Sequence, residues 1–322
     1  MPMGASHLTN ATPISFAGHE SFTLRHTWLT KGVRHCFADP GVFNQKNSMA
    51  VLGVGKNMVR SIRHWCLASQ MLEEDPAMSN NRGRRLRATT LGERIFVGED
   101  AWDPYLEDTG TLWLLHWLIS TNKRYATTWH FAFGQVHRPE FTKAWLEDEL
   151  VNYAGKTPGA RATRGTIRRD VEAFLRTYVR PKRGVGIGEI PEESLDCPLV
   201  DLGLIRELAD EGSYAFNRGP KKSLPDEVFV YALNDYARGL GGETVSFYDL
   251  AYGQDSPGRV FKLDEPSLGE RLERIHDLSD GAIQFNETAG LKELIYSRHL
   301  EGIDLLKGYY VSYAEAVRRS RG

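Results

Sequence analysis

Apolar residues recur at helical spacing through most of the first half of the chain. The pattern is clearest over Ser48–Glu74, where LGVG at 52–55 interrupts it and predicts a helix, a tight turn and a second helix. Asn57, near the start of the second helix, is a candidate cap. A polar stretch, the basic run RGRRLR and the segment TTLGERIF then predict a short strand and a closing helix. Over 51–96 this order is typical of a winged helix-turn-helix, a common DNA-binding unit.

Two later parts of the chain show the same order more faintly. Residues 140–153 and 163–178 predict two helices around the turn KTPGARA, which makes a second winged-helix-like unit at about 140–179. The C-terminal part predicts helices over Pro225–Arg238, Ser246–Tyr252 and Glu265–Leu278, a strand over Ala282–Phe285 and a further helix over Thr288–Tyr296. The predicted fold class is therefore mainly α with small β-hairpins, in tandem winged-helix-like (helix-turn-helix) units.

One segment stands out as a domain boundary. Residues 181–198, PKRGVGIGEIPEESLDCP, are rich in glycine and proline and lack apolar periodicity, so they predict a linker or a long surface loop. This linker separates an N-terminal region, 1–180, in which we expect DNA binding, from a C-terminal winged-helix-like domain, 199–322. The recognition helix of the second domain, PSLGERLERIHDL, is not basic, which indicates contact with a partner protein.

Composition narrows the class of protein only slightly. The 322 residues are 41% hydrophobic and 25% charged with a formal net charge of −2, which is ordinary for a globular protein. Three widely spaced cysteines, Cys36, Cys66 and Cys197, fit a reducing cytosol rather than a disulfide framework or a zinc site. The longest apolar stretch, Thr111–Ile119, is too short to cross a bilayer, and no signal peptide pattern opens the chain. We therefore expect a cytoplasmic protein without membrane contact.

Positive charge is concentrated in two zones. In the first, four basic side chains fall at positions i, i+4, i+7 and i+8 of one predicted helix, opposite its apolar side: Lys56, Arg60, Arg63 and His64. A helix that faces a DNA groove needs this arrangement, although a solvated charged face gives the same pattern. With the neighbouring basic run, the predicted DNA-binding set is Lys56, Asn57, Arg60, Arg63, Arg84, Arg85 and Arg87.

The second zone spans Lys156–Arg183, with nine Lys or Arg residues against two acids. Arg164, Arg168 and Arg169 crowd the start of a predicted helix, where cations oppose the helix dipole. Helix stability does not explain these arginines, whereas phosphate binding does, because guanidinium forks match phosphate oxygens. The alternative is an ordinary solvated surface.

Familiar catalytic signatures are absent, since GVGKN is not a Walker loop and no GxSxG elbow occurs. Chemistry is therefore sought in two polar patches. In the first, FAGHESFTLRHTW, His19, Glu20 and Arg25 could supply a general base, water or metal positioning, and charge stabilisation for phosphodiester cleavage. The alternative is a polar cluster buried between domains.

The second patch, GEDAWDPYLED, lies just before the apolar segment. Its acids, Asp103 and Asp108 among them, could hold Mg²⁺ or Mn²⁺ as paired carboxylates do in nucleases. The alternative for Asp108 is simpler, because an aspartate directly before an apolar helix makes a good N-cap.

Four sequence blocks together resemble a bacterial family: FAGHESFTLRHTWLTKG, VLGVGKNMVRSIRHWCLAS, WDPYLEDTGTLWLLHWLIS and TIRRDVEAFLRTYV. In order and spacing they are similar to the SspB-like nickase family of bacterial single-stranded DNA phosphorothioation systems, a former domain-of-unknown-function family. The resemblance covers about 16–179 and is weaker afterwards. It implies a DNA nickase of an antiphage defence system that acts with a cysteine desulfurase, an ATPase and an ATP-pyrophosphatase-like protein. It assigns no catalytic residue.

Three functions stay open on the sequence. The first is a metal-dependent nickase that cuts one DNA strand so that sulfur can be incorporated. The second is a non-enzymatic DNA-binding adaptor or regulator that recruits the sulfur-transfer proteins. The third is a scaffold whose C-terminal winged helix binds a partner protein, and a homodimer is an open alternative to a monomer in each case.

Overall fold

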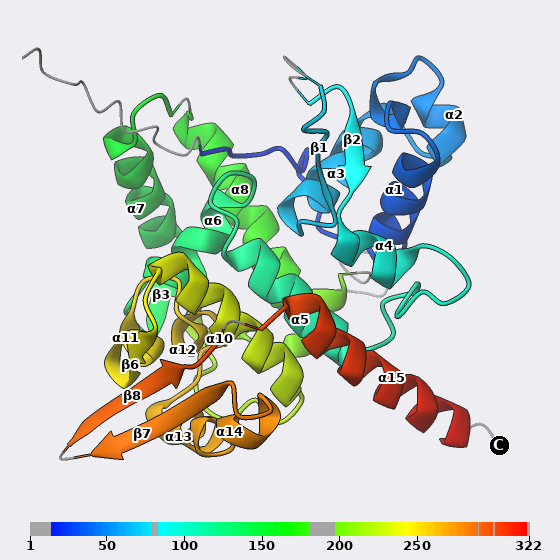
Figure 1. Cartoon of the computed structure of the whole chain (residues 1–322). Coiled ribbons are helices and arrows are strands. Elements are labelled where there is room, and N and C mark those ends of the chain that lie inside the picture. The colour runs from blue at the N-terminus through cyan, green and yellow to red at the C-terminus, as the bar shows by residue number, and fades with distance from the viewer. Residues whose placement is uncertain are drawn as a thin grey trace, which may run out of the picture.

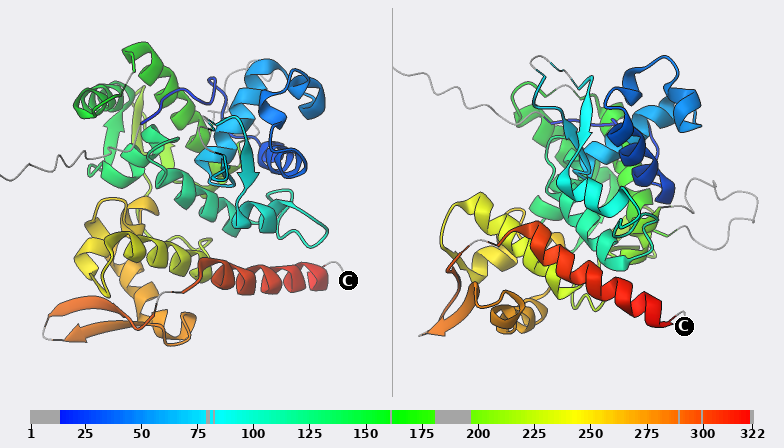
Figure 2. Two further views of the ribbon diagram at one scale, coloured as in Figure 1. Left: turned by 45° about the horizontal axis from the view of Figure 1, so that its top comes forward. Right: turned by 45° about the vertical axis from the view of Figure 1, so that its right-hand side comes forward.

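The computed structural model describes residues 14–78, 81, 83–160, 162–180, 197–288, 290–298 and 300–320. This part of the chain is mainly helical and contains three small antiparallel sheets, so the predicted fold class is confirmed at that level. The N-terminal helices, in blue and cyan, lie beside the green helices of the middle of the chain (Figure 1). The yellow, orange and red C-terminal elements form a second layer beneath both (Figure 2).

The first unit contains the predicted helix-turn-helix, strand and closing helix, with two further helices ahead of them and a strand where the sequence predicts the end of the second helix. Seven elements make up the described part of the unit. These are α1 (His26–Ala38), the 3-10 helix η1 (Val42–Asn44), α2 (Ser48–Leu52), α3 (Lys56–Ala68), β1 (Leu72–Glu74), β2 (Leu86–Ala88) and α4 (Thr90–Phe96). The turn between α2 and α3 depends on Gly53, whose φ of 63° suits a residue without a Cβ atom. β1 and β2 pair antiparallel after α3, which packs against α1 through buried side chains such as Ile62.

The middle of the chain supplies the centre of the core. Its elements are α5 (Thr109–Ser120), α6 (Thr127–His130), the π-helix η2 (Phe131–Gln135), β3 (Glu140–Thr142), α7 (Lys143–Lys156) and α8 (Arg164–Tyr178). Every residue of α5 after Thr109 is buried, as expected for a helix that is apolar on all sides. α7 begins at Lys143 rather than at Glu140 as predicted, because residues 140–142 pair with a strand 71 or more positions away.

That pairing connects the two regions that the sequence divides. The 3-10 helix η3 (Pro198–Leu202), β4 (Ile205–Glu207) and β5 (Ser213–Phe216) follow the predicted linker. β5 lies between β3 and β4, with Glu140 opposite Ala215. The predicted linker itself lies outside the described residues except for its last two positions. The division into two regions stays a prediction, and the sheet of β3, β4 and β5 contains strands from both of them.

The C-terminal layer departs most from the sequence prediction. It comprises α10 (Asp226–Leu240), β6 (Thr244–Ser246), α11 (Phe247–Tyr252), α12 (Pro257–Val260), α13 (Glu265–Glu273), α14 (Ile275–Leu278), β7 (Ile283–Thr288), β8 (Leu291–Tyr296) and α15 (Gly302–Ser320). The predicted helix over Thr288–Tyr296 is wrong, since β8 is the central strand between β6 and β7. The predicted helix over Glu265–Leu278 is two helices that meet at Arg274.

A single apolar core runs through both layers, from Leu24 near the first helix to Tyr310 in the last. Polar side chains also cross between the layers. The indole N–H groups of Trp113 and Trp117 on α5 donate to Ser223 and Asp235. Within the described residues, no helix is both long and apolar enough to span a membrane.

Candidate functional site

The first polar patch forms a tight turn ahead of α1. Three of its non-glycine residues have a left-handed backbone: Ala17, Glu20 and Ser21, with φ values of 56°, 50° and 71°. Such conformations are costly for residues with a Cβ atom and persist only where surrounding contacts hold them. The contacts of His19, in the middle of this turn, supply that restraint.

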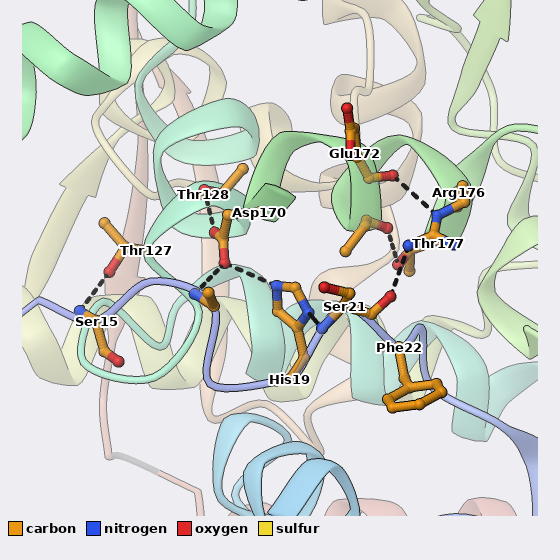
Figure 3. Close-up of polar contacts among 12 residues, drawn as sticks. Ser15, His19, Ser21, Phe22, Thr127, Thr128, Asp170, Glu172, Arg176 and Thr177 are labelled. Carbon is orange, nitrogen blue, oxygen red and sulfur yellow. Dashed lines mark hydrogen bonds and ion pairs between the residues drawn. The ribbon is translucent and has the colours of Figure 1, made fainter. Parts of the chain in front are cut away.

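His19 is fully buried and both of its ring nitrogens are engaged (Figure 3). Nδ1 accepts the backbone N–H of Ser21 at 3.1 Å, so the ring proton of the neutral imidazole is on Nε2. Nε2 lies 2.8 Å from Oδ1 of Asp170 on α8 and donates to it. The backbone arrangement therefore fixes one tautomer of His19.

Asp170 is the hub of this network. Its carboxylate also accepts the backbone N–H of Ala17 at 2.6 Å and the hydroxyl of Thr128 at 2.5 Å. Burial opposes ionisation of Asp170, but the hydrogen bonds that the carboxylate accepts from His19, Thr128 and Ala17 outweigh burial and lower the pKa of the carboxyl. A carboxylate with this many donors stays ionised inside the core.

Aromatic rings enclose the His19 imidazole. The ring centres of His64, Trp129 and Trp65 lie 5.7, 5.9 and 6.2 Å from that of His19. His64 is itself buried, and burial, aided by His19, lowers its pKa to about 3. The sequence analysis placed His64 with the exposed cations of its helix, and this is wrong: the ring belongs to the buried side of α3 and is neutral near pH 7.

The turn also joins the two basic helices. Glu20 Oε1 lies 3.2 Å from Nη1 of Arg60 on α3, and the carbonyl of Ser21 accepts a hydrogen bond of 2.6 Å from Arg176 on α8. Arg25, beside them, lies over the ring of Trp28 at 5.1 Å. Residues 17–25 thus form a clasp, which we call the N-terminal clasp, between the helices that carry the two basic zones.

The predicted DNA-binding side chains of the first unit are mostly exposed. Lys56, Asn57 and Arg60 lie on the outer side of α3, at its start. Arg63 is half-buried and donates to the carbonyl of Gly83 at 3.0 Å, which attaches the β1–β2 loop to α3. Of the other predicted members, Arg84 and Arg85 are exposed, and Arg87 forms an ion pair of 2.6 Å with Glu73.

The second basic zone is exposed at the start of α8. Arg168 and Arg169 lie on the outer side of that helix, between the inward-pointing Ile167 and Asp170. Arg164 forms an ion pair of 2.6 Å with Asp148 on α7. Thr163 caps α8 by accepting the backbone N–H of Thr166.

The second polar patch serves the start of α5. Asp108 is the N-cap and accepts the backbone N–H groups of Gly110 and Thr111, and the Tyr309 hydroxyl donates to it at 2.8 Å. Asp103 accepts the backbone N–H groups of Glu107 and Asp108. Burial raises the pKa of Asp103 despite these donors. Among the described residues no hydrogen bond or ion pair connects either acid to His19 or Glu20.

Metal ligands are not gathered in either patch. Within the described ranges no group of three His, Cys, Asp or Glu side chains is placed to hold a metal ion. The side chains of His19, Asp103 and Asp108 are occupied by hydrogen bonds, whereas Glu20 keeps part of its carboxylate exposed. The expected Mg²⁺ or Mn²⁺ therefore stays a prediction.

Sequence reasoning missed the partner that organises the site. Asp170 is one of the two acids of the second basic zone, yet it lies on the apolar side of its helix with Ile167, Val171 and Phe174. A lone acid at an inward helical position requires a buried donor. The helical spacing of Asp170 with its apolar neighbours could therefore have predicted that this acid is buried and paired.

Comparison with known proteins gives a consistent set of relatives. Residues 16–310 match the family described as "Protein of unknown function (DUF4007)". The chain resembles a crystal structure of magnesium ion-bound SspB at 30% identity and a TM-score of 0.82, covering 95% of this chain and 90% of that one. A second SspB crystal structure gives a TM-score of 0.81 at the same identity and coverage. No curated protein sequence matches the chain.

Proposed function

The chain belongs to the DUF4007 family of SspB-like proteins, and from this membership we propose that it is the DNA-nicking component of a bacterial DNA phosphorothioation system. In such a defence system against phage, one strand is cut so that sulfur can replace a phosphate oxygen. A cysteine desulfurase, an ATPase and an ATP-pyrophosphatase-like protein would act with it. The observation that supports a role in nicking is the N-terminal clasp, which carries the partly exposed carboxylate of Glu20 between two basic helices.

DNA binding is proposed for the α1–α4 unit in the manner of a winged helix. α3 would face the DNA with Lys56, Asn57 and Arg60, and the β1–β2 loop would contribute Arg84 and Arg85 as the wing. Arg63 would support the wing from behind through its bond to Gly83. Arg168 and Arg169 on α8 would bind phosphates of the same DNA on the far side of the clasp.

We assign the reaction to Glu20 rather than to His19. Both nitrogens of His19 are engaged and its ring is shielded from solvent, so His19 acts as a positioning residue that fixes the turn. The side chain of Glu20 is 32% exposed and next in the chain. The Glu20 carboxylate would take a proton from water as that water attacks phosphorus, one bridging P–O bond would break, and the leaving oxygen would take up a proton.

A divalent ion fits this arrangement only in part. Mg²⁺ is often bound by one or two carboxylates together with substrate phosphates, and Glu20 supplies one. Bound there, Mg²⁺ or Mn²⁺ would stabilise negative charge on the phosphate. Arg60, which pairs with Glu20, and Arg25 of the clasp would stabilise the same charge directly.

Relaxation of supercoiled plasmid in Mg²⁺ or Mn²⁺ tests the proposal. Glu20→Gln is expected to nick at least about a hundredfold more slowly, the size of effect typical of a lost general base, while it binds DNA at least as well as the wild type. The matched control is Glu99→Gln, which changes an exposed acid outside the clasp. Nicking by Glu20→Gln at the control's rate would remove Glu20 from the reaction.

A second function, a non-enzymatic DNA-binding adaptor that recruits the sulfur-transfer proteins, is favoured by a different observation. Asp103 and Asp108 are committed to backbone hydrogen bonds, so neither is free to hold a metal ion as placed. An adaptor binds DNA with steep salt dependence and leaves plasmid intact at any metal concentration. The wild-type plasmid assay alone separates the two functions.

A further inference from the structure

A compact cationic pocket lies far along the chain from the N-terminal clasp, where the π-helix η2 meets α12. Three segments supply it: residues 136–138 after η2, residues 216–218 after β5, and residues 251–262 around α12. Its lining contains four basic side chains, Arg138, Arg218, Arg259 and Lys262, and the imidazole of His137, which accepts a hydrogen bond from Arg259. The sequence analysis did not single out any of these side chains.

The two inner cations are almost completely buried. Lys262 is 5% exposed and Arg259 is 8% exposed. Lys262 Nζ donates to the carbonyl of Phe133 at 3.1 Å, and Arg259 Nη1 donates to the carbonyl of Gly134 at 2.8 Å. Both carbonyls belong to η2, so the π-helix holds the two side chains in place through its backbone oxygens. π-Helical turns are rare and often mark functional sites.

Neither buried cation forms an ion pair within the described residues. The charge of Asp255 favours the charged form of Arg259, but Asp255 Oδ2 lies 3.0 Å from Nε2 of His130 instead. Phe216 lies 4.0 Å from Lys262 Nζ, which offers a cation–π contact instead of a counter-charge. Buried charges are normally paired, and this pair of cations shares its pocket with two further arginines.

The cations raise one another's free energy. Burial, together with Arg259, Arg218 and Lys221, lowers the pKa of Lys262 well below its usual range. Burial lowers the pKa of Lys221 to about 8, and Lys221 Nζ bonds the carbonyl of Lys262 at 3.3 Å. An anion in the pocket would offset both the free-energy cost of burying these cations and their mutual repulsion.

A purely structural role accounts for part of this arrangement. Lys262 and Arg259 satisfy carbonyl groups at the end of the π-helix, and that alone would justify them. It does not account for Arg218, which is exposed at the mouth of the pocket and adds repulsion to Lys262. Stability would favour a neutral residue at that position. Arg138 is also exposed at the mouth, where its guanidinium lies 4.7 Å from the centre of the Trp145 ring.

We propose that this pocket binds a phosphate group. Arg138 and Arg218 would grip its outer oxygens with their guanidinium forks, and Arg259 and Lys262 would form the cationic floor. The ligand is a phosphate monoester, a phosphodiester or inorganic phosphate, from a DNA backbone or from a free metabolite. The inference is independent of the nicking proposal, because it involves none of the residues of the clasp.

Two left-handed residues bracket the α12 segment and support a shaped site. Asp255 and Lys262 have φ values of 59° and 54°, although neither is glycine. A backbone held in this region on both sides of a short helix costs stability and is common around ligand sites. It also aims the side chain of Lys262 inward, where its ammonium reaches the carbonyls of η2.

Calorimetric titration of the full-length protein with inorganic phosphate tests the site. The wild type is expected to bind phosphate, and Arg218→Gln to bind it about tenfold more weakly, as for one lost charge-assisted hydrogen bond. The matched control is Arg206→Gln, an exposed arginine on β4 outside the pocket, which should leave phosphate affinity unchanged. Because Arg218 adds repulsion, the Tm of Arg218→Gln should equal or exceed that of the wild type, which separates a binding defect from misfolding.

A second arm identifies the source of the phosphate. DNA binding is measured for the same variants, with and without phosphate, at one ionic strength fixed with chloride. If a DNA backbone is the ligand, Arg218→Gln weakens DNA binding and phosphate competes with DNA. If a free phosphate compound is the ligand, only phosphate binding falls. Absence of phosphate binding by the wild type, or equal affinities of Arg218→Gln and Arg206→Gln for both ligands, overturns the proposal.

Discussion

At the scale of single residues, the clasp depends on a contact that only glycine permits. A Cβ atom at Gly18 would lie 2.4 Å from Nδ1 of His64, a ring fixed in the core. Gly18→Ala should therefore destabilise the protein by about 1–3 kcal/mol, as overpacked sites do. Urea unfolding measures the change.

The control for Gly18→Ala is Gly155→Ala on α7. A Cβ atom at Gly155 meets no atom within 4 Å, so alanine should raise helix stability by about 0.5–1 kcal/mol. Equal free energies of unfolding for the two variants would mean that the clasp moves freely and does not press on His64.

His64 makes the free energy of unfolding depend on pH. Its pKa is about 3 in the folded protein, against an ordinary value of 6.5, so below pH 6.5 the unfolded chain takes up a proton that the native state refuses. Stability present above pH 6.5 is therefore lost as pH falls, by roughly 2 kcal/mol at pH 5. His64→Asn should lose about that much less than the wild type between pH 7 and pH 5.

Comparison of variants at each pH isolates this residue. Burial raises the pKa values of Asp103 and Asp235, which opposes the trend, but both acids are common to every variant. His276→Asn removes an exposed histidine and should keep the pH dependence of the wild type. A His64→Asn variant with unchanged pH dependence would place the His64 ring in solvent.

Residues of the clasp itself could be predicted from the sequence, whereas the buried residues that hold it could not. His19 and Glu20 are recognisable because a His-Glu pair outside any helical pattern suggests acid–base chemistry. Asp170 and Thr128 come from positions more than 100 residues away, and only the fold brings them to the turn. His64 was misplaced because a helical face drawn at 100° per residue has an edge, and tertiary packing decides which edge residue is buried.

At the scale of elements, two substitutions of Asp108 distinguish its role as a helix cap from a role in catalysis. Asparagine caps a helix about as well as aspartate, whereas alanine costs about 1–2 kcal/mol. Asp108→Asn should therefore keep most of the stability of α5 and any nicking activity, while Asp108→Ala should lower the Tm. Thermal unfolding and the plasmid assay together decide, and loss of nicking by well-folded Asp108→Asn would return Asp108 to the reaction.

The elements themselves were predicted with uneven success. α3 was expected because its apolar side repeats at helical spacing and its start follows a glycine turn. β8 was mistaken for a helix because LKELIY contains good helix formers. Its strand conformation is set by partners on both sides, β6 and β7, and Gly290 with φ 84° makes the turn between β7 and β8.

At the scale of the whole molecule, the two predicted regions should unfold together. Strand β3 needs β5, and the His116 ring on α5 bonds the carbonyl of Val260 in the other layer at 2.9 Å. We expect circular dichroism and tryptophan fluorescence to report one coincident transition. A fragment of residues 199–322 should lack cooperative unfolding, and separate transitions of the full chain or a stable fragment would restore independent domains.

The shared sheet also determines when its strands can pair during synthesis of the chain. β5 begins at Ser213, 71 residues after β3 ends at Thr142. At about 5–20 residues per second, a ribosome needs roughly 4–14 seconds to make that interval. During that time the nascent chain holds β3 as an open edge that can pair with another chain. The growing N-terminal region therefore passes through a window in which chaperone binding, or pausing of translation between these strands, decides how much protein reaches the native state.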